Sequence, residues 1–334
     1  MKRNLLILPF VLIMVACNTK RSVPDVSGIQ VALEVERFEK DFFEMDTTQV
    51  DKALQQLNTK HPGFTQDFLF NILGTSPDSA SKDVRLFIRS YGNIYATSQG
   101  KTKDFAAVVS EIKKGLQFVH YYFPGYKLPT KLVTFVGPLN SFGNIITPNA
   151  LGVGLQLYLG KAYPLYLSEQ GQQMYPLFVS RRFEPPYIPV NCMKNIIDDM
   201  YPTNSIGKPL VEQMVEAGKR QYLLDLLLPY TADSLKTGYT AAQLQGCYES
   251  EKNIWSFFVQ NDLLYNSDPN LTRDYMNDGP NTQALGDASP GNIGQFVGTQ
   301  IVTKWMEKQK SLPLDALMKT PAKQIFSEAK YKPK

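Results

Sequence analysis

The chain is poor in the residues on which most hydrolases and metalloenzymes depend. Its 334 residues include only two histidines, His61 and His120. A Ser-His-Asp hydrolase needs a histidine beside an activated serine, and the sequence contains no Gly-x-Ser-x-Gly elbow. It also lacks the Gly-x4-Gly-Lys-Ser/Thr loop that cradles nucleotide phosphates. The sequence therefore offers no motif for nucleophilic catalysis or for nucleotide hydrolysis.

The contexts of the two histidines differ. His120 lies among aromatic residues on a segment with helical periodicity, which favours a hydrogen-bonded core or boundary position over a catalytic one. His61 precedes Pro62 in an expected turn, and we expect it to face solvent.

Long apolar runs are also scarce, and the clearest one lies at the N-terminus. Lys2 and Arg3 precede an apolar run at residues 5–15, which is too short to span a bilayer and is typical of a secretory signal peptide. Because Met14-Val15-Ala16-Cys17 ends in cysteine, the segment resembles a bacterial lipobox. This resemblance implies a signal peptide at residues 1–16 and a lipid on Cys17. A cleaved signal followed by an incidental cysteine is the alternative.

A lipid on Cys17 predicts a protein of the cell envelope, anchored to a membrane and facing the periplasm, with the inner and outer membranes both open. Without Lys2 and Arg3, the 35 basic residues become 33 against 31 acidic ones, a net charge of +2. A nearly neutral body argues against a nucleic-acid partner. The other two cysteines, Cys192 and Cys247, are expected to be separate buried thiols, with a disulfide as the alternative.

Hydrophobic periodicity predicts an α+β fold that is mostly helical. Residues 17–30 are interpreted as a lipid-anchored N-terminus and polar spacer, and residues 31–334 as a single globular domain, with two closely packed lobes as the alternative. Apolar positions recur at helical spacing through most of the N-terminal third, whereas two β-type runs predict a small mixed sheet packed among helices. The predicted strands cover residues 132–137 and 150–160, and further helices are predicted at residues 105–123, 193–200, 210–228, 241–264 and 292–309.

Glycines cluster at the start of the last of these helices. Gly291, Gly294 and Gly298 lie there at helical spacing, which predicts close packing against another helix. Binding of an anion at the helix N-terminus is the alternative.

The helix predicted at residues 210–228 lies, in chain order, where zinc peptidases of the zincin type carry His-Glu-x-x-His. The corresponding residues are Val215-Glu216-Ala217-Gly218-Lys219, so Glu216 keeps the position of the base while valine and lysine replace the ligands. Glu251 lies on the following helix, where a zincin often has a further acid. The plain interpretation of Glu216 and Lys219 is an i,i+3 ion pair. We therefore expect no catalytic residue, no bound metal and no cofactor, with Glu216, Lys219 and Glu251 as remnants of a degenerate site.

Several segments in order along the chain resemble the gliding-motility lipoproteins of the GldB type, which belong to the Bacteroidota. They are Pro189-Val190-Asn191-Cys192-Met193-Lys194-Asn195, Gly218-Lys219-Arg220-Gln221-Tyr222, Glu251-Lys252-Asn253-Ile254-Trp255 and Ser289-Pro290-Gly291-Asn292-Ile293-Gly294. The resemblance implies a zincin-like fold without zinc ligands, and a non-enzymatic envelope component that binds proteins of the gliding machinery. On that hypothesis, a cleft between residues 154–160 and the Glu216 helix is reused for a protein partner.

The alternative function is an envelope metal-dependent hydrolase of degenerate zincin type, which would use Glu216, Glu251 and Asp225 around an unusual metal site. We favour the non-enzymatic hypothesis, because a zinc site with neither imidazole nor thiolate would suit this ion poorly.

Overall fold

The computed structural model describes residues 23–102, 105–203, 205–309 and 311–333. The predicted signal peptide at residues 1–16 and the predicted lipidation site Cys17 lie outside the described residues.

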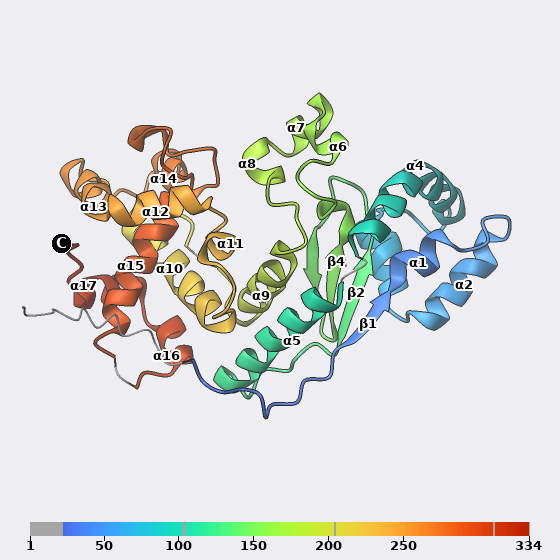
Figure 1. Ribbon diagram of the computed structural model, residues 1–334, viewed down its shortest axis with the longest axis horizontal. Helices are drawn as coiled ribbons and strands as arrows, with labels where there is room; N and C mark the ends of the chain where they lie inside the picture. Colours follow the sequence, from blue (N-terminus) through green and yellow to red (C-terminus); the bar gives the residue numbers. More distant parts are fainter. Residues whose placement is uncertain (1–22, 103–104, 204, 310, 334) are drawn as a thin grey trace, which may run out of the picture.

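A four-stranded mixed sheet organises the N-terminal half of the molecule (Figure 1). The strand order is β1(Glu34–Arg37), β2(Lys131–Phe135), β4(Ala150–Gly154) and β3(Asn144–Ile146). The first three strands are parallel, with Val35 opposite Leu132 and Leu132 opposite Leu151, and β3 runs antiparallel to β4. The predicted small mixed sheet is confirmed. The strand predicted at residues 150–160 is too long, because a short 3-10 turn, η2(Leu155–Leu157), follows Gly154 directly.

Helices cover both faces of this sheet, as Figure 1 shows. Successive residues of a strand point to opposite faces, so Leu132 and Val133 enter different apolar clusters. Leu132 packs in the cluster with α5(Phe105–Tyr122) and α9(Tyr187–Met200). Val133 packs with a group of phenylalanines from the N-terminal helices. These helices are α1(Phe38–Phe43), α2(Val50–Lys60), α3(Phe64–Gln66), the π-helical turn η1(Asp67–Ile72) and α4(Ala80–Lys101).

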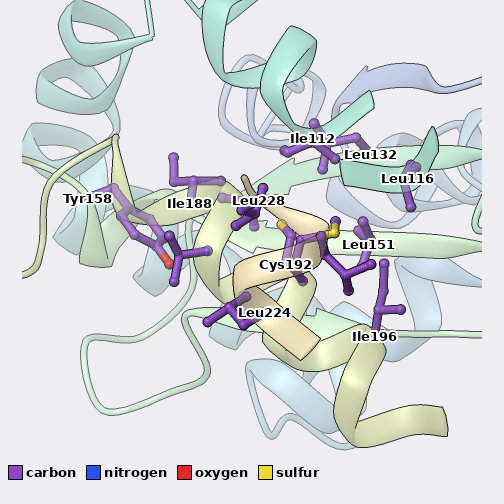
Figure 2. Packing of buried hydrophobic residues seen from close by; sticks show 14 of the residues in the cluster. Ile112, Leu116, Leu132, Leu151, Tyr158, Ile188, Cys192, Ile196, Leu224 and Leu228 are labelled. Carbon is purple, nitrogen blue, oxygen red and sulfur yellow. The ribbon is translucent and has the colours of Figure 1, made fainter. Parts of the chain in front are cut away.

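The larger of these clusters joins the sheet to α9 and α10 (Figure 2). Ile112 and Leu116 of α5, and Leu132 and Leu151 of the sheet, surround the buried face of α9, which carries Cys192. Leu224 adds the last turns of α10(Leu210–Leu227) to the same core. Helix α9 therefore lies between the sheet and the C-terminal half of the molecule.

The C-terminal half is helical, and α10 and α15(Ile293–Met306) pack at its centre. Gly218 and Gly298 face each other at this crossing: a Cβ on Gly298 would lie 1.6 Å from the carbonyl oxygen of Met214. The predicted close packing at Gly298 is confirmed, since only glycine allows the two backbones to approach so closely.

The remaining helices surround these elements. Their bounds are α6(Pro164–Leu167), α7(Glu169–Met174), α8(Leu177–Ser180), α11(Asp233–Thr237), α12(Ala241–Glu249), α13(Glu251–Gln260), α14(Pro269–Met276), η3(Gln283–Leu285), α16(Leu314–Lys319) and α17(Ala322–Ala329). The single helix predicted at residues 241–264 is in fact two, α12 and α13, separated at Ser250. Helix α9 begins at Tyr187, before its predicted start, because Pro189 lies in its first turn, where proline is tolerated. The fold is α+β and mostly helical, as predicted.

Both predictions for the histidines are wrong. His61 is only 3% exposed, and its Nδ1 and Nε2 atoms lie 2.8 Å and 2.7 Å from carboxylate oxygens of Glu36 and Asp41. These partners, from β1 and α1, draw the ring into the body of the protein. His120 is exposed in the last turn of α5, near the end of the helix.

The predictions for the cysteines and for the spacer have different outcomes. Cys192 and Cys247 are both free and buried, which confirms two separate thiols. Residues 23–30, by contrast, do not extend away from the body. Val26 is 1% exposed within the largest apolar cluster, and Gln117 Nε2 donates to the carbonyl oxygen of Ile29 at 2.7 Å. The ordered body of the protein thus begins earlier than the predicted boundary at residue 31.

Candidate functional site

The five residues that match the zincin motif lie on α10, which packs on α15 rather than on the sheet. Val215 is fully buried in the apolar core between these two helices. Lys219 is 1% exposed, and its Nζ lies 3.2 Å from each carboxylate oxygen of Glu216. The predicted Glu216–Lys219 pair is present.

Lys219 also joins α10 to the C-terminal helices. Its Nζ donates to the carbonyl oxygens of Thr320, at 2.6 Å, and Met318, at 3.3 Å, where α16 ends. The last carbonyl groups of a helix have no partner within the helix, and a cation placed there satisfies them. Burial lowers the pKa of Lys219, and the neighbouring Glu216 opposes that shift. This arrangement gives both side chains a structural role.

The other two acids of the hydrolase hypothesis have partners of their own. Glu251 accepts a hydrogen bond from Tyr331 Oη at 2.5 Å. Asp225 lies 3.0 Å from Lys236 Nζ, and burial raises the pKa of its carboxyl although the lysine acts in the opposite direction. Within the described ranges, no group of three or more His, Cys, Asp and Glu side chains is placed to hold a metal ion. Glu216, Glu251 and Asp225 are therefore engaged in three separate local contacts.

A cavity of about 420 Å³ lies instead beside α9. One face of this helix lines it, formed by residues at positions i, i+4, i+7, i+8 and i+11, which are Tyr187, Asn191, Lys194, Asn195 and Asp198. The opposite walls come from the β3–β4 region, from α8 and the segment after it, and from α11 and the residue after it, and include Gly143, Asn144, Leu157, Tyr158, Val179, Arg182, Phe183, Leu235 and Gly238. A polar helix face thus meets a wall of mixed aromatic, apolar and amide groups.

A hydrogen-bond network holds one wall of this cavity in place. Tyr158 Oη donates to the side-chain oxygen of Asn144 and accepts from Asn191 Nδ2 at 2.8 Å. Asn144 also donates to the sulfur of Cys192 at 3.6 Å. Burial raises the pKa of Tyr158, and it raises the pKa of Cys192 to about 12, so both groups stay protonated at neutral pH. The network ties β3, the turn after β4 and α9 to one another.

The charged side chains of the cavity are not equivalent. Arg182 forms an ion pair with Asp278, and Asp198 forms one with Arg220 of α10. Lys194 Nζ makes no hydrogen bond or ion pair with any residue that the structure describes. Burial, followed by the repulsion of Arg182, lowers the pKa of Lys194 to about 8. Among the described residues, Lys194 is thus the cavity cation without an ion pair of its own, although the more distant carboxylates of Asp278 and Asp198 attract it.

The structure does not place the Glu216 helix, α10, next to residues 154–160 as expected for the predicted cleft. Helix α9 packs beside β3 and lies closer to the sheet than α10 does. Gln156 is fully buried, where it accepts from the amide of Gly137 at 2.9 Å and donates to the carbonyl oxygen of Phe142 at 3.0 Å. It is a core residue and does not line a surface. Tyr158 does line the cavity, though on its α9 side.

A polar stripe along α9 is the sequence signal for this site. Asn191, Lys194, Asn195 and Asp198 recur at helical spacing within a helix whose other positions are mostly apolar. Such a stripe normally faces solvent, and only the fold shows that it faces a cavity.

Fold and cavity together define a mostly helical α+β protein with a polar cleft at the antiparallel edge of a small sheet. The family model described as "Gliding motility protein GldB" matches residues 19–333, nearly the whole chain. The chain belongs to this family, which confirms the resemblance found in its sequence. No curated protein and no solved structure matches it, and the zincin-like relationship stays a prediction. Within the described ranges, no helix combines the length and the apolar character needed to span a bilayer.

Proposed function

We propose that this protein is a non-enzymatic component of the gliding apparatus, held at the cell envelope by a lipid on Cys17, and that it acts by binding other envelope proteins. The match of the gliding-motility family over residues 19–333 carries the proposal. The lipobox-like Met14-Val15-Ala16-Cys17 supports the anchor, because it follows a charged start and a short apolar run. The periplasmic side is the location that this signal favours.

The contacts of Glu216 support the non-enzymatic part of the proposal. A general base must reach the proton that it removes, with its carboxylate free to accept it. Both carboxylate oxygens of Glu216 instead face Lys219, whose ammonium also binds two backbone carbonyl oxygens. This clamp accounts for both residues without a reaction.

Complementation of a deletion strain tests the anchor and the role of Glu216 separately. We expect Cys17→Ser to abolish incorporation of labelled fatty acid, because the protein then carries no lipid. The same change should reduce the spreading of colonies of the complemented strain, because the protein then leaves the membrane. Cys247→Ala is the matched control, since Cys247 is buried inside the body, and it should keep both label and spreading. A Cys17→Ser protein that still carries the label would refute the lipid anchor.

Glu216→Gln keeps the shape and one acceptor oxygen of the side chain. Because it leaves the buried ammonium of Lys219 with a neutral partner, it should cost about 1–3 kcal/mol of stability, and leave spreading intact at normal abundance on a blot. A catalytic carboxylate would instead contribute on the order of 10² to 10⁴ in rate. Loss of spreading in Glu216→Gln at normal abundance, together with stoichiometric zinc and cleavage of casein by the wild type, would establish the hydrolase.

A further inference from the structure

The cavity beside α9 contains one positive charge that no described carboxylate neutralises through an ion pair. Lys194 lies half-buried on the polar face of α9, and its ammonium has no hydrogen-bond or ion-pair partner among the described residues. A buried charge is costly unless it is paired. Since Lys194 remains unpaired inside a cavity, the arrangement suits a ligand that supplies the missing anion.

The other charges of the cavity define how much negative charge the site can accept. Arg182 is neutralised by Asp278, and Asp198 is neutralised by Arg220. The excess is therefore the single positive charge of Lys194. A ligand with one negative charge balances it, whereas a dianion would bring a second charge close to the carboxylate of Asp198.

The uncharged walls define the rest of the ligand. Leu157, Val179, Phe183 and Leu235 provide apolar and aromatic surface, and Asn195 adds an amide one residue along α9 from Lys194. The volume of about 420 Å³ falls within the usual range for small-ligand sites. The hydrogen bonds among Tyr158, Asn144 and Asn191 hold one wall in place before any ligand arrives, which reduces the entropy lost on binding.

We propose that this cavity binds a carboxylate carried on an apolar or aromatic group, with Lys194 as its counter-ion. The ligand is either a small organic acid or the C-terminal end of a peptide, which share this chemistry. The site is independent of the gliding role, since it follows from the charges and walls of the cavity alone.

The pH dependence of binding provides a readout specific to Lys194. Burial lowers the pKa of this ammonium to about 8, so affinity should fall as the pH rises from 7 to 9 and the lysine loses its charge. The other charged groups near it, Arg182, Asp278 and Asp198, remain ion-paired. Tyr158 and Tyr187 have raised pKa values because of burial and stay neutral over this range.

Calorimetric titration of the purified full chain in detergent with N-acetylphenylalanine tests the proposal. We expect saturable binding at pH 7, and binding at least about tenfold weaker for the uncharged N-acetylphenylalanine amide. Phenyl phosphate, at a pH where it is a dianion, should bind more weakly than the carboxylate. An acetylated tripeptide ending in phenylalanine distinguishes the two sources: a tighter complex than that of N-acetylphenylalanine indicates a peptide end, and an equal one a small acid.

Three variants place the binding at Lys194. Lys194→Met should weaken the binding of N-acetylphenylalanine at least about tenfold. Lys194→Arg, which keeps the charge, should retain most of the affinity. Lys82→Met removes an exposed ammonium from α4 and should change nothing. Equal binding of acid and amide, tighter binding of phenyl phosphate, or no saturable binding at millimolar concentration would overturn the proposal. Because the acid and amide are compared on the wild type, the test holds even if Lys194→Met fails to fold.

Discussion

The crossing of α10 and α15 predicts opposite effects for the same substitution at two helical glycines. At Gly298, a new Cβ would lie 1.6 Å from the carbonyl oxygen of Met214 and 2.3 Å from its carbonyl carbon. Ordinary contacts between non-bonded heavy atoms begin at about 3.5 Å. In Gly298→Ala the two helices would therefore have to separate by roughly 2 Å. The obstacle is backbone, which cannot rotate away as a flexible side chain can.

The magnitude follows from two opposing terms. Alanine is the better helix former, and it contributes up to about 1 kcal/mol relative to glycine. Overpacking a core typically costs about 1–3 kcal/mol when side chains adjust. Since Gly298→Ala displaces two helices that form the centre of the C-terminal core, we expect a net loss of about 3 kcal/mol or more.

Gly92→Ala on α4 is the matched control. A Cβ at Gly92 meets no other described atom within 4 Å, so only the helix-propensity term remains. This variant should be more stable than the wild type by about 0.5–1 kcal/mol.

Equilibrium unfolding in urea, followed by circular dichroism, measures both variants. The urea concentration at the unfolding midpoint should fall for Gly298→Ala and rise for Gly92→Ala. The slope of the unfolding free energy against urea concentration should stay unchanged. A Gly298→Ala protein as stable as the wild type would refute the close backbone contact. A destabilised Gly92→Ala would show that the open space beside Gly92 is needed for some other contact.

Further predictions concern acid stability and thiol reactivity. Burial alone would raise the pKa values of Glu36 and Asp41, but hydrogen bonds from lysines and from His61 outweigh it and lower both. A carboxyl whose pKa is lower in the folded state than in the unfolded state stabilises the protein at pH values above its unfolded-state pKa, which is about 4. This contribution disappears as the pH falls through the folded-state pKa. The urea midpoint of the wild type should therefore fall more steeply below about pH 4 than that of Glu36→Gln; parallel curves would contradict the role of this cluster. Burial raises the pKa values of Cys192 and Cys247 to about 12, so a thiol reagent at pH 8 should label neither in the folded protein and both after unfolding. Rapid labelling of the folded chain at either cysteine would contradict their burial.

Local patterns in the sequence were enough to identify the longer helices, the two main strands and the helix contact at Gly298. These features depend on short-range periodicity, which reports the apolar face of each element. The pair formed by Glu216 and Lys219 was also predictable, since its members lie three positions apart on one helix. Its two carbonyl partners were not, because Met318 and Thr320 lie about a hundred residues further along the chain.

The sequence by itself determined the fold class, the family and the residue types available for chemistry. Only the tertiary structure decided which elements meet. Periodicity predicts that α9 and α10 each bury one face, but it does not reveal which of them lies beside the sheet. That choice depends on the combined packing of α5, the sheet and α15, which are distant in sequence. It places the polar stripe of α9 in a cavity, leaves Lys194 there without an ion pair among the described residues, and draws His61 between two carboxylates that lie 25 and 20 residues away in the chain.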